Sequence, residues 1–482
     1  MEQRAGAQIS RRAFVQSLVI LFVLMMLAGV LTRVIPSGQY TRVQVEGREV
    51  IDPASFRFTP RPDYPIWRWF TAPFEAPFAP GGSTVLVIIV FLLFIGGAFA
   101  VLDKTGIIQA VLSRIVGRYR ERKYALLLVI SFFFMIMGAF FGIFEEVVPL
   151  VPLMIALAYS LGWDAFVGLG MSILATNLGF TAAITNPFTI GVAQQLAGLP
   201  LFSGAGLRVA IFAVVYAIFA HFLTVYARRI ERDPATSLIH GQDEAERTRY
   251  AAAQSATQAE APHLGRAVAW FLAFVVLILA VLLTGPFIPA ISSYALPLVG
   301  VLFLIGGTGA GLLSGAGGRT VWAGLHEGII GILPAVPLIL MAVSISFIVS
   351  SGGVMDTILH AASQSFTSAG PYAAALTVFG LALVIEFFVA SGSAKAFLMM
   401  PILLPLGDLI GVTRQTTVLA YCFGDGFSNL AYPTNPVLLI SLGLTVISYP
   451  QWMRWTAKLW LRVLLASVAF LGIAVAIHFG PF

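Results

Sequence analysis

The sequence contains one stretch twice, and this pair decides the fold. The first copy, Gly142–Pro187, opens GIFEEVVPLVPLMIALAYSLG, continues as an apolar run and closes on ITNP. The second copy, Ser391–Pro436, opens SGSAKAFLMMPILLPLGDLIG, continues as an apolar run and closes on PTNP. Matching positions lie 249 residues apart at three places: Pro152 and Pro401, Gly162 and Gly411, and the two Thr-Asn-Pro motifs. Agreement at three places without a gap indicates an internal repeat.

Composition sets the class of protein around these copies. The chain is 59% hydrophobic and 10% charged, and its apolar runs repeatedly reach about 20 residues, the length of a membrane-spanning helix. We predict an all-α polytopic membrane protein. The single cysteine, Cys422, excludes an intramolecular disulfide, and no Cys/His cluster offers a metal site. The net charge of +6 lies in loops, where it orients the chain rather than binding nucleic acid.

Basic residues predict which loops face the cytoplasm. Arg11 and Arg12 precede an apolar run to Leu31, which fits either a twin-arginine export signal or a first membrane helix. The run is long enough to span and no small-residue cleavage motif follows, so we predict a helix with a cytoplasmic N-terminus. The basic loop 114–123 is also predicted to be cytoplasmic. We expect a multi-pass protein of the bacterial cytoplasmic (inner) membrane with an extracytoplasmic C-terminus.

The proline-rich segment 36–82 is predicted to lie outside the membrane. It contains a hairpin pattern around Val43–Gly47 and an aromatic stretch, Trp67–Phe70, that suits the headgroup layer. Its mixed charge indicates no chemistry. We expect this loop to serve as a cap or a dimer contact.

Each copy is predicted to contain a hairpin followed by a broken helix. In the first half the hairpin is 124–161 and the helix is 164–199, which would be near 50 Å long if unbroken at about 1.5 Å per residue. Asn177-Leu178-Gly179 and Thr185-Asn186-Pro187 are predicted to break it. The second half repeats this order with a hairpin over 372–411 and a broken helix over 413–447.

The halves divide the chain into three parts. Residues 1–228 form the first half with its extra helix, 229–265 a polar cytoplasmic linker, and 266–482 the second half. Positive-inside counting gives the copies opposite orientations, so we predict an inverted repeat, which is typical of transporters with a site at the membrane midplane. Counting alone does not decide whether the arms re-enter or cross fully. The polar tips, Glu145-Glu146 and Ser391–Lys395, favour re-entrant hairpins.

Polar residues at the breaks and tips have two interpretations each. Thr185, Asn186, Thr434 and Asn435 are predicted to cap half-helices, with ligand contact as an added role. Ser391, Gly392 and Ser393 begin a half-helix whose free N–H groups suit a carboxylate, the alternative being a polar tip packed on protein. Asp425 and Asn429 lie one helical turn apart and suit Na+ or a substrate amine. Pairing of Asp425 with Lys395, or of Glu386 within its arm, is the structural alternative.

Four strings carry a resemblance to a known family: Ser391-Gly392-Ser393-Ala394-Lys395, Met400-Pro401, Thr413-Arg414-Gln415-Thr416 and Phe423-Gly424-Asp425-Gly426-Phe427-Ser428-Asn429. Across nearly its whole length the chain resembles the YfcC branch of the DcuC (C4-dicarboxylate anaerobic carrier) family, ion transporter superfamily. The resemblance implies about nine transmembrane helices plus two re-entrant hairpins, a homodimer, and an elevator with scaffold and transport domains. It also implies carboxylate substrates, either C4-dicarboxylates or basic amino acids. Relatives carry Ser-Asn-Thr at both tips, and Gly-Ile-Phe-Glu-Glu here departs from a symmetric two-sodium site.

Three function classes compete, and a secondary active transporter explains the repeat, both tips and both breaks. A channel does not need two matched hairpins, and an intramembrane enzyme needs a nucleophile–base or metal constellation that the sequence does not offer. We therefore predict a transporter, not an enzyme, with no cofactor beyond a coupling Na+ or H+. Its expected partners are a small-molecule substrate, membrane lipid and a second copy of the chain, with no nucleic acid.

Charge counting favours one substrate class over another. Glu145, Glu146, Glu386 and Asp425 outnumber Lys395, so a dianion meets repulsion unless cations accompany it. We predict a basic or zwitterionic amino acid, with a Na+- or H+-coupled C4-dicarboxylate as the alternative. The predicted substrate site comprises Glu145, Glu146, Asn177, Thr185, Asn186, Ser391, Gly392, Ser393, Lys395, Asp425, Asn429, Thr434 and Asn435, with Na+ at Asn186, Asp425 and Asn435.

Overall fold

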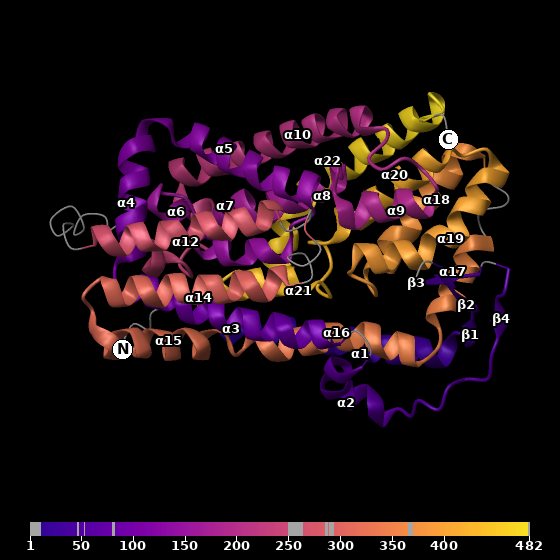
Figure 1. The fold of residues 1–482 in the computed structure, drawn as a ribbon, viewed down its shortest axis with the longest axis horizontal. Coiled ribbons are helices and arrows are strands. Elements are labelled where there is room, and N and C mark those ends of the chain that lie inside the picture. The colour runs from indigo at the N-terminus through magenta and orange to yellow at the C-terminus, as the bar shows by residue number, and fades with distance from the viewer. Residues whose placement is uncertain are drawn as a thin grey trace.

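The computed structural model describes residues 11–45, 48–52, 54–79, 82–248, 264–284, 288, 294–364 and 370–480. The described chain is mostly helical, from α1 (Arg11–Val34) to α22 (Tyr449–Ala476) (Figure 1). Within the described residues eight helices are long and apolar enough to cross a membrane. This confirms the polytopic membrane class. The division into nine crossings and two re-entrant hairpins stays a prediction.

The helices form two packed groups. The first, here called the α3 bundle, is built around α3 and joins residues from both halves of the sequence (Figure 1). Its members are α1, α2 (Trp67–Glu75), α3 (Ser83–Lys104), α12 (Gly265–Thr284), α14 (Ala295–Leu313), α15 (Gly317–Ile332) and α16 (Ala335–Ser351).

The second group, here called the repeat bundle, contains both copies of the repeated stretch. Its members are α5 (Lys123–Ile136), α6 (Val151–Ser160), α7 (Ala165–Leu169), α8 (Ala175–Ala182), α9 (Val192–Leu196), α10 (Ala205–Arg232), α18 (Pro371–Glu386), α19 (Gly392–Ile410), α20 (Arg414–Ser428), α21 (Pro436–Gly443) and α22. Two amphipathic helices, α4 (Ile107–Tyr119) and α17 (Met355–Gln364), connect the bundles along the chain.

The segment 36–82 forms a small cap on α17. The predicted hairpin is present as β2 (Arg42–Val45) paired antiparallel with β3 (Arg48–Ile51), its turn lying outside the described residues. A second pair joins β1 (Gly38–Gln39) to β4 (Arg57–Phe58). Arg42 holds the cap to α17 through an ion pair with Asp356 at 3.1 Å, and Phe56 stacks on His360 with ring centroids 3.8 Å apart.

The first copy folds as two arms and an interrupted helix. α5 ends in a π-helical turn, Met137–Phe141, and a 3-10 helix over Glu145–Leu150 leads into α6. The following helix is interrupted at residues 183–186, where Ala183 has a left-handed φ of 42°. A π-helical turn, Pro187–Gly191, then leads into α9. The predicted break at Thr185-Asn186-Pro187 is therefore confirmed.

The predicted break at Asn177-Leu178-Gly179 is wrong, because these residues lie inside α8. Gly179 serves close packing instead. A Cβ on Gly179 would collide with the carbonyl oxygen of Met135, and one on Gly138 would collide with the carbonyl of Thr176. The two glycines let α8 and the first hairpin arm approach backbone to backbone, which a side chain would prevent.

The second copy has matching elements. α18 and α19 are arms joined at Phe387–Ser391, and the helix that follows is interrupted between α20 and α21. α8 and α20, the first halves of the two interrupted helices, pack on one another. A Cβ on Gly426 would overlap the backbone of Phe180 and Thr181 at this crossing. Because α8 and α20 cross here, the breaks of both copies lie within the repeat bundle.

The start of the predicted linker is folded against the repeat bundle, while residues 249–263 lie outside the described part. Asp164, the N-cap of α7, accepts hydrogen bonds from Ser237 Oγ at 2.7 Å and Tyr226 Oη at 2.6 Å. Asp243 is fully buried, and neither carboxylate oxygen has a hydrogen-bond partner among the described residues. Burial, followed by the charge of Asp164, raises the pKa of Asp243 to about 6.

This pKa predicts that docking of the linker depends on pH. Because the pKa of Asp243 is raised in the docked state, the docked segment binds a proton more tightly than the undocked one. Docking therefore weakens as the pH rises from the unfolded-state pKa to about 6, and it levels off above that pH. Asp243→Asn should therefore slow amide hydrogen exchange of residues 237–247 relative to the wild type at neutral pH and change it little below about pH 4. Equal protection in both proteins at neutral pH would contradict the assignment.

Candidate functional site

Buried polar atoms without hydrogen-bond partners gather in the repeat bundle. In the first copy they belong to Asn177 and Thr181 on α8 and to Thr189 just after the break, and in the second to Thr434 and Ser441. Glu386 Oε1 and Asp425 Oδ2 are further members. Because an unpaired buried polar group costs about 1–3 kcal/mol, such a concentration marks a place where a ligand, ion or water supplies the missing partners.

The first break is closed by its own polar side chains. Asn186 caps the second half-helix by accepting hydrogen bonds from Phe188 N at 2.9 Å and Thr189 N at 3.2 Å. Its amide donates to the carbonyl of Gly138, and Thr185 donates to the carbonyl of Phe140 at 3.0 Å. These bonds tie the break to the first hairpin. The predicted capping role is confirmed for Asn186, whereas Thr185 holds the break to the hairpin arm and caps no half-helix.

The second break uses the same chemistry. Asn435 caps α21 by accepting from Val437 N at 2.9 Å and donates to Asn429 Oδ1 at 3.2 Å. Thr434 is buried, and its hydroxyl has no partner in the described part of the chain. Asn435 therefore has the predicted structural role, while Thr434 presents an unused hydroxyl.

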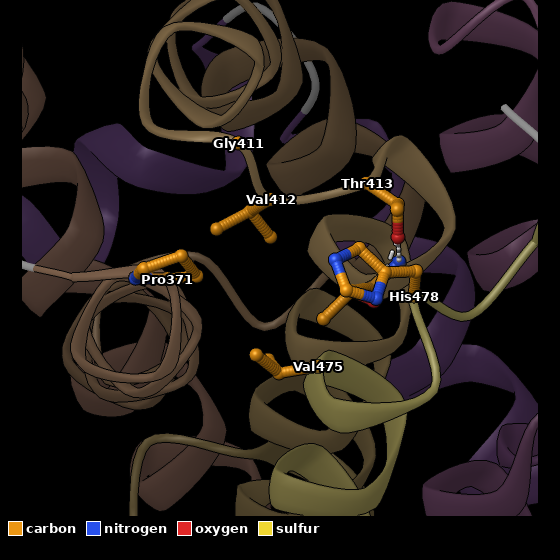
Figure 2. A pocket seen from close by; sticks show the side chains of 7 residues that line it. Pro371, Gly411, Val412, Thr413, Val475 and His478 are labelled. Atoms are coloured by element: carbon orange, nitrogen blue, oxygen red, sulfur yellow. Dashed lines mark hydrogen bonds between the residues drawn. The ribbon is translucent and has the colours of Figure 1, made fainter.

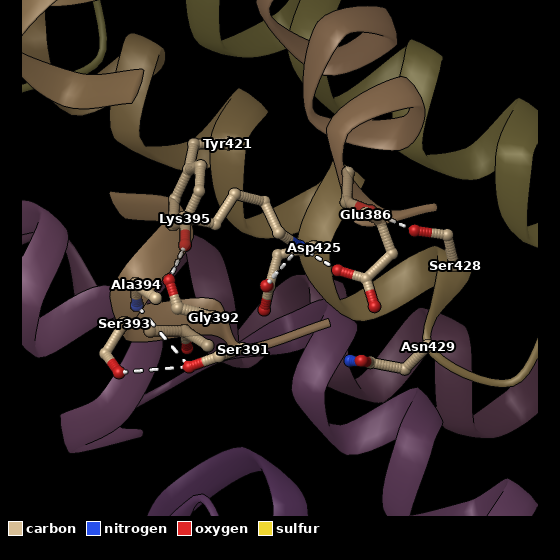
Figure 3. Close-up of polar contacts among 12 residues, drawn as sticks. Glu386, Ser391, Gly392, Ser393, Ala394, Lys395, Tyr421, Asp425, Ser428 and Asn429 are labelled. Atoms are coloured by element: carbon tan, nitrogen blue, oxygen red, sulfur yellow. Dashed lines mark hydrogen bonds and ion pairs between the residues drawn. The ribbon is translucent and has the colours of Figure 1, made fainter. Parts of the chain in front are cut away.

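The second hairpin closes over a cluster of buried charges. Ser391 caps α19 by accepting from Ala394 N at 3.5 Å, and its hydroxyl lies 3.4 Å from that of Ser393. Lys395, one turn into α19, points inward and donates to Asp425 Oδ1 at 2.8 Å and to Glu386 Oε2 (Figure 3). All three charged residues are at most 1% exposed.

This charge cluster, Glu386–Lys395–Asp425, contains the Asp425–Lys395 pair that the sequence offered as a structural alternative, while Glu386 pairs with Lys395 of the other arm instead of within its own. Tyr421 stabilises the closed hairpin by donating its hydroxyl to the carbonyl of Gly392. The predicted site does not include Tyr421, Thr181, Thr189 or Ser441. Their only sequence signal is a polar group within an otherwise apolar broken helix, which does not distinguish a site from a solvent-free packing contact.

The first tip differs from the second. Glu145 is exposed, and Glu146 is half-buried and accepts from Phe144 N at 3.3 Å. The 3-10 helix that carries both glutamates contacts α14 of the α3 bundle and α21 of the repeat bundle. The two acids thus lie where the bundles meet, and nothing in the described chain brings either into a hydrogen bond with the charge cluster.

The residues predicted to hold Na+ have other partners. Asn186 and Asn435 direct their carboxamide oxygens to backbone N–H groups of their own half-helices, and Asp425 is paired with Lys395. Among the described residues neither asparagine is hydrogen-bonded to Asp425. Sodium binding at these three residues remains a prediction.

A separate cavity of about 190 Å³ lies at the start of α18 and α20. Pro371, Val412, Thr413, Val475 and His478 line it together with Gly411 and Thr416 (Figure 2). Thr416 precedes Asp425 by nine residues on α20, about 14 Å along a helix. The cavity is therefore distinct from the charge cluster.

Comparison with known proteins decides the family. The family model described as "C4-dicarboxylate anaerobic carrier" matches residues 14–476. The chain belongs to the DcuC family. It is also 32% identical over 506 residues, 96% of each chain, to the protein of Escherichia coli strain K12 described as "Putative basic amino acid antiporter YfcC". The resemblance inferred from the sequence is thus confirmed, and this DcuC-family protein is a membrane transporter.

More distant likenesses accompany these matches. An uncharacterized protein of Haemophilus influenzae is 24% identical over 395 residues, covering 81% of this chain and 76% of its own. Among solved structures, the YdaH transporter of Alcanivorax borkumensis has a TM-score of 0.42 at 17% identity, covering 96% of this chain and 100% of its own. The efflux pump MtrF of Neisseria gonorrhoeae has a TM-score of 0.41 at 16% identity, covering 96% and 95%.

The Asn435 cap on α21 should contribute measurably to the stability of this DcuC-family transporter. Asn435→Ala removes the acceptor of the Val437 N–H and should destabilise the protein by about 0.5–2 kcal/mol. Asn435→Ser keeps an N-cap oxygen and should recover most of that loss. Thermal unfolding in detergent checks both. If the serine variant were no more stable than the alanine variant, capping would not be the role of Asn435.

Proposed function

We propose that this protein is a secondary active transporter for a basic or zwitterionic amino acid, working by an elevator mechanism coupled to Na+, H+ or exchange of substrates. The single observation that carries the proposal is the juxtaposition of an anion-binding and a cation-binding group. A Cβ on Gly392, in the first turn of α19, would come within 3.0 Å of Asp425 Oδ1. Free N–H groups of a helix start and two buried carboxylates therefore lie side by side.

An amino acid matches this arrangement at both ends. Its carboxylate suits the N–H groups at Ser391, Gly392 and Ser393, where the helix dipole favours negative charge. The cationic group of a basic side chain suits Asp425 and Glu386, which together exceed the single positive charge of Lys395. The printed name of the Escherichia coli relative, a putative basic amino acid antiporter, supports the same class.

A C4-dicarboxylate carrier is the second candidate, favoured by the description of the matching family model. A dianion has one end suited to the start of α19, but its other end meets Asp425 and Glu386. Coulomb repulsion at that end requires one or more accompanying cations. The second candidate is therefore tied to uptake with Na+ or H+, whereas a basic amino acid needs no additional charge.

The division into two bundles supports an elevator built on an inverted repeat. The repeat bundle carries both interrupted helices and the charge cluster, and the α3 bundle carries neither. The chain passes between the bundles at α4, at α17 and between α10 and α12. The repeat bundle can therefore move along the α3 bundle with little change in the helix packing inside either bundle. A homodimer through the α3 bundle, with the N-terminus cytoplasmic, completes the proposal.

Counterflow in proteoliposomes tests the function. We expect saturable counterflow of arginine or lysine, with the Asp425→Asn variant reduced on the order of a hundredfold, because the loss of one charged partner of a bound ligand costs about 2–5 kcal/mol. Asp408→Asn is the matched control, since Asp408 forms an exposed surface pair with Arg414 and should transport as the wild type does.

The other function classes give different results in the same assay. A channel would give conductance without counterflow, and an enzyme would give a new product. Counterflow of succinate or fumarate without amino-acid counterflow would support the dicarboxylate carrier. Wild-type transport by a folded Asp425→Asn variant would remove Asp425 from the mechanism and overturn the proposal.

A further inference from the structure

The charge cluster of the second hairpin is not electrically balanced. One ammonium, on Lys395, faces two carboxylates, on Glu386 and Asp425, so the cluster has a net charge of −1 when all three groups are ionised. Each carboxylate gives one oxygen to Lys395. The other oxygen of each, Glu386 Oε1 and Asp425 Oδ2, is buried with no hydrogen-bond partner in the described chain.

The neighbouring elements do not supply the missing positive charge. On α20 the nearest titratable groups are Tyr421, which donates its hydroxyl to Gly392, and the buried thiol of Cys422. From α8 and the segment after the first break come neutral groups, Asn177, Thr181 and Thr189.

One buried cation approaches from α10. The guanidinium of Arg208 donates hydrogen bonds to three backbone carbonyls: Ile184 O at 3.1 Å, Phe202 O at 3.0 Å and Ser203 O at 2.8 Å. It is thus fixed beside the first break and does not pair with Glu386 or Asp425.

An unbalanced charge at this depth is costly. Transfer of an ion to a low-dielectric interior is unfavourable enough that a buried group takes up or releases a proton instead. Each of the two carboxylates has one buried oxygen with no partner in the described chain, and one small cation bound to either oxygen would balance the charge. The dipole at the start of α19 offsets only a small part of this charge.

We propose that Glu386 and Asp425 share one bound proton in the substrate-free transporter, and that the cationic group of the substrate displaces it. The proposal rests on the function proposed above and names its coupling ion. The proton leaves the carboxyl group for water as the ammonium or guanidinium of the substrate arrives. The cluster is then neutral with either ligand, and it carries a net charge only when both are absent.

This charge balance implies that the transporter exchanges the proton for the cationic substrate. The repeat bundle moves readily with the proton or with the cationic substrate, because the buried site is neutral in both cases. An empty site carries an unpaired charge and resists movement through the apolar interior. Inward passage of one cation is thereby tied to outward passage of the other.

Infrared difference spectroscopy on substrate-free protein in Na+-free buffer tests the proton itself. The wild type should show the C=O stretching band of a protonated carboxyl group at neutral pH, and free lysine should abolish it. Glu386→Gln and Asp425→Asn each remove one negative charge, so neither should show the band. Asp408→Asn, altered at the surface, should keep it.

Proton release gives the second test. In weakly buffered solution we expect about one proton released per free lysine bound. Norleucine, which has the same chain without the terminal ammonium, should release none. Glu386→Gln should release none with either ligand and should bind lysine at least about tenfold more weakly, because the bound cation then leaves the cluster with excess positive charge.

The outcomes separate the two proposals. A carboxyl band that Na+ abolishes, or lysine binding without proton release, would overturn the proton site while leaving amino-acid transport in place. A band present in the wild type and lost in both variants, with no amino acid able to bind, would keep the proton site and overturn the substrate assignment. If Glu386→Gln does not fold, the comparison of lysine with norleucine on the wild type decides.

Discussion

An ammonium buried between two carboxylates holds the second hairpin closed. Lys395 comes from α19, Glu386 from α18 and Asp425 from α20, so the cluster joins both arms of the hairpin to the interrupted helix behind it. Removing one partner from a buried ion pair typically costs about 3–5 kcal/mol. Tyr421 adds a further bond from α20 to the start of α19. The position of the tip relative to the second interrupted helix therefore depends on charges that water does not reach.

Interrupted helices impose the second constraint. Each break exposes backbone N–H and C=O groups at membrane depth, where they must be bonded within the protein. Asn186 and Asn435 satisfy the N–H groups at the start of each second half-helix. Because these side chains complete the local backbone bonding, the unpaired groups of Asn177, Thr181, Thr189, Thr434 and Ser441 remain for other partners. Structural capping thus falls to the two asparagines, and the neighbouring unpaired groups are left available to the proposed substrate.

Local chemistry made much of this fold predictable from the sequence. Proline with a preceding asparagine marks a half-helix start, because proline lacks a donor and asparagine accepts from the exposed N–H groups, and both breaks lie where these motifs occur. Gly179 was misread because the sequence alone does not distinguish a glycine that ends a helix from one that lets two backbones meet. The pairing of Glu386 with Lys395 could not be predicted from the sequence for a similar reason. It depends on how tightly the hairpin closes, which is a tertiary property.

An experimental structure of the transporter with bound lysine or arginine tests the account most directly. The account predicts the ligand carboxylate at the start of α19, against Ser391, Gly392 and Ser393. It also predicts a ligand cationic group within hydrogen-bonding distance of Glu386 Oε1 or Asp425 Oδ2, the two oxygens that lack partners. A ligand seated instead in the cavity beside His478, with the Glu386–Lys395–Asp425 cluster unchanged and sealed, would contradict it.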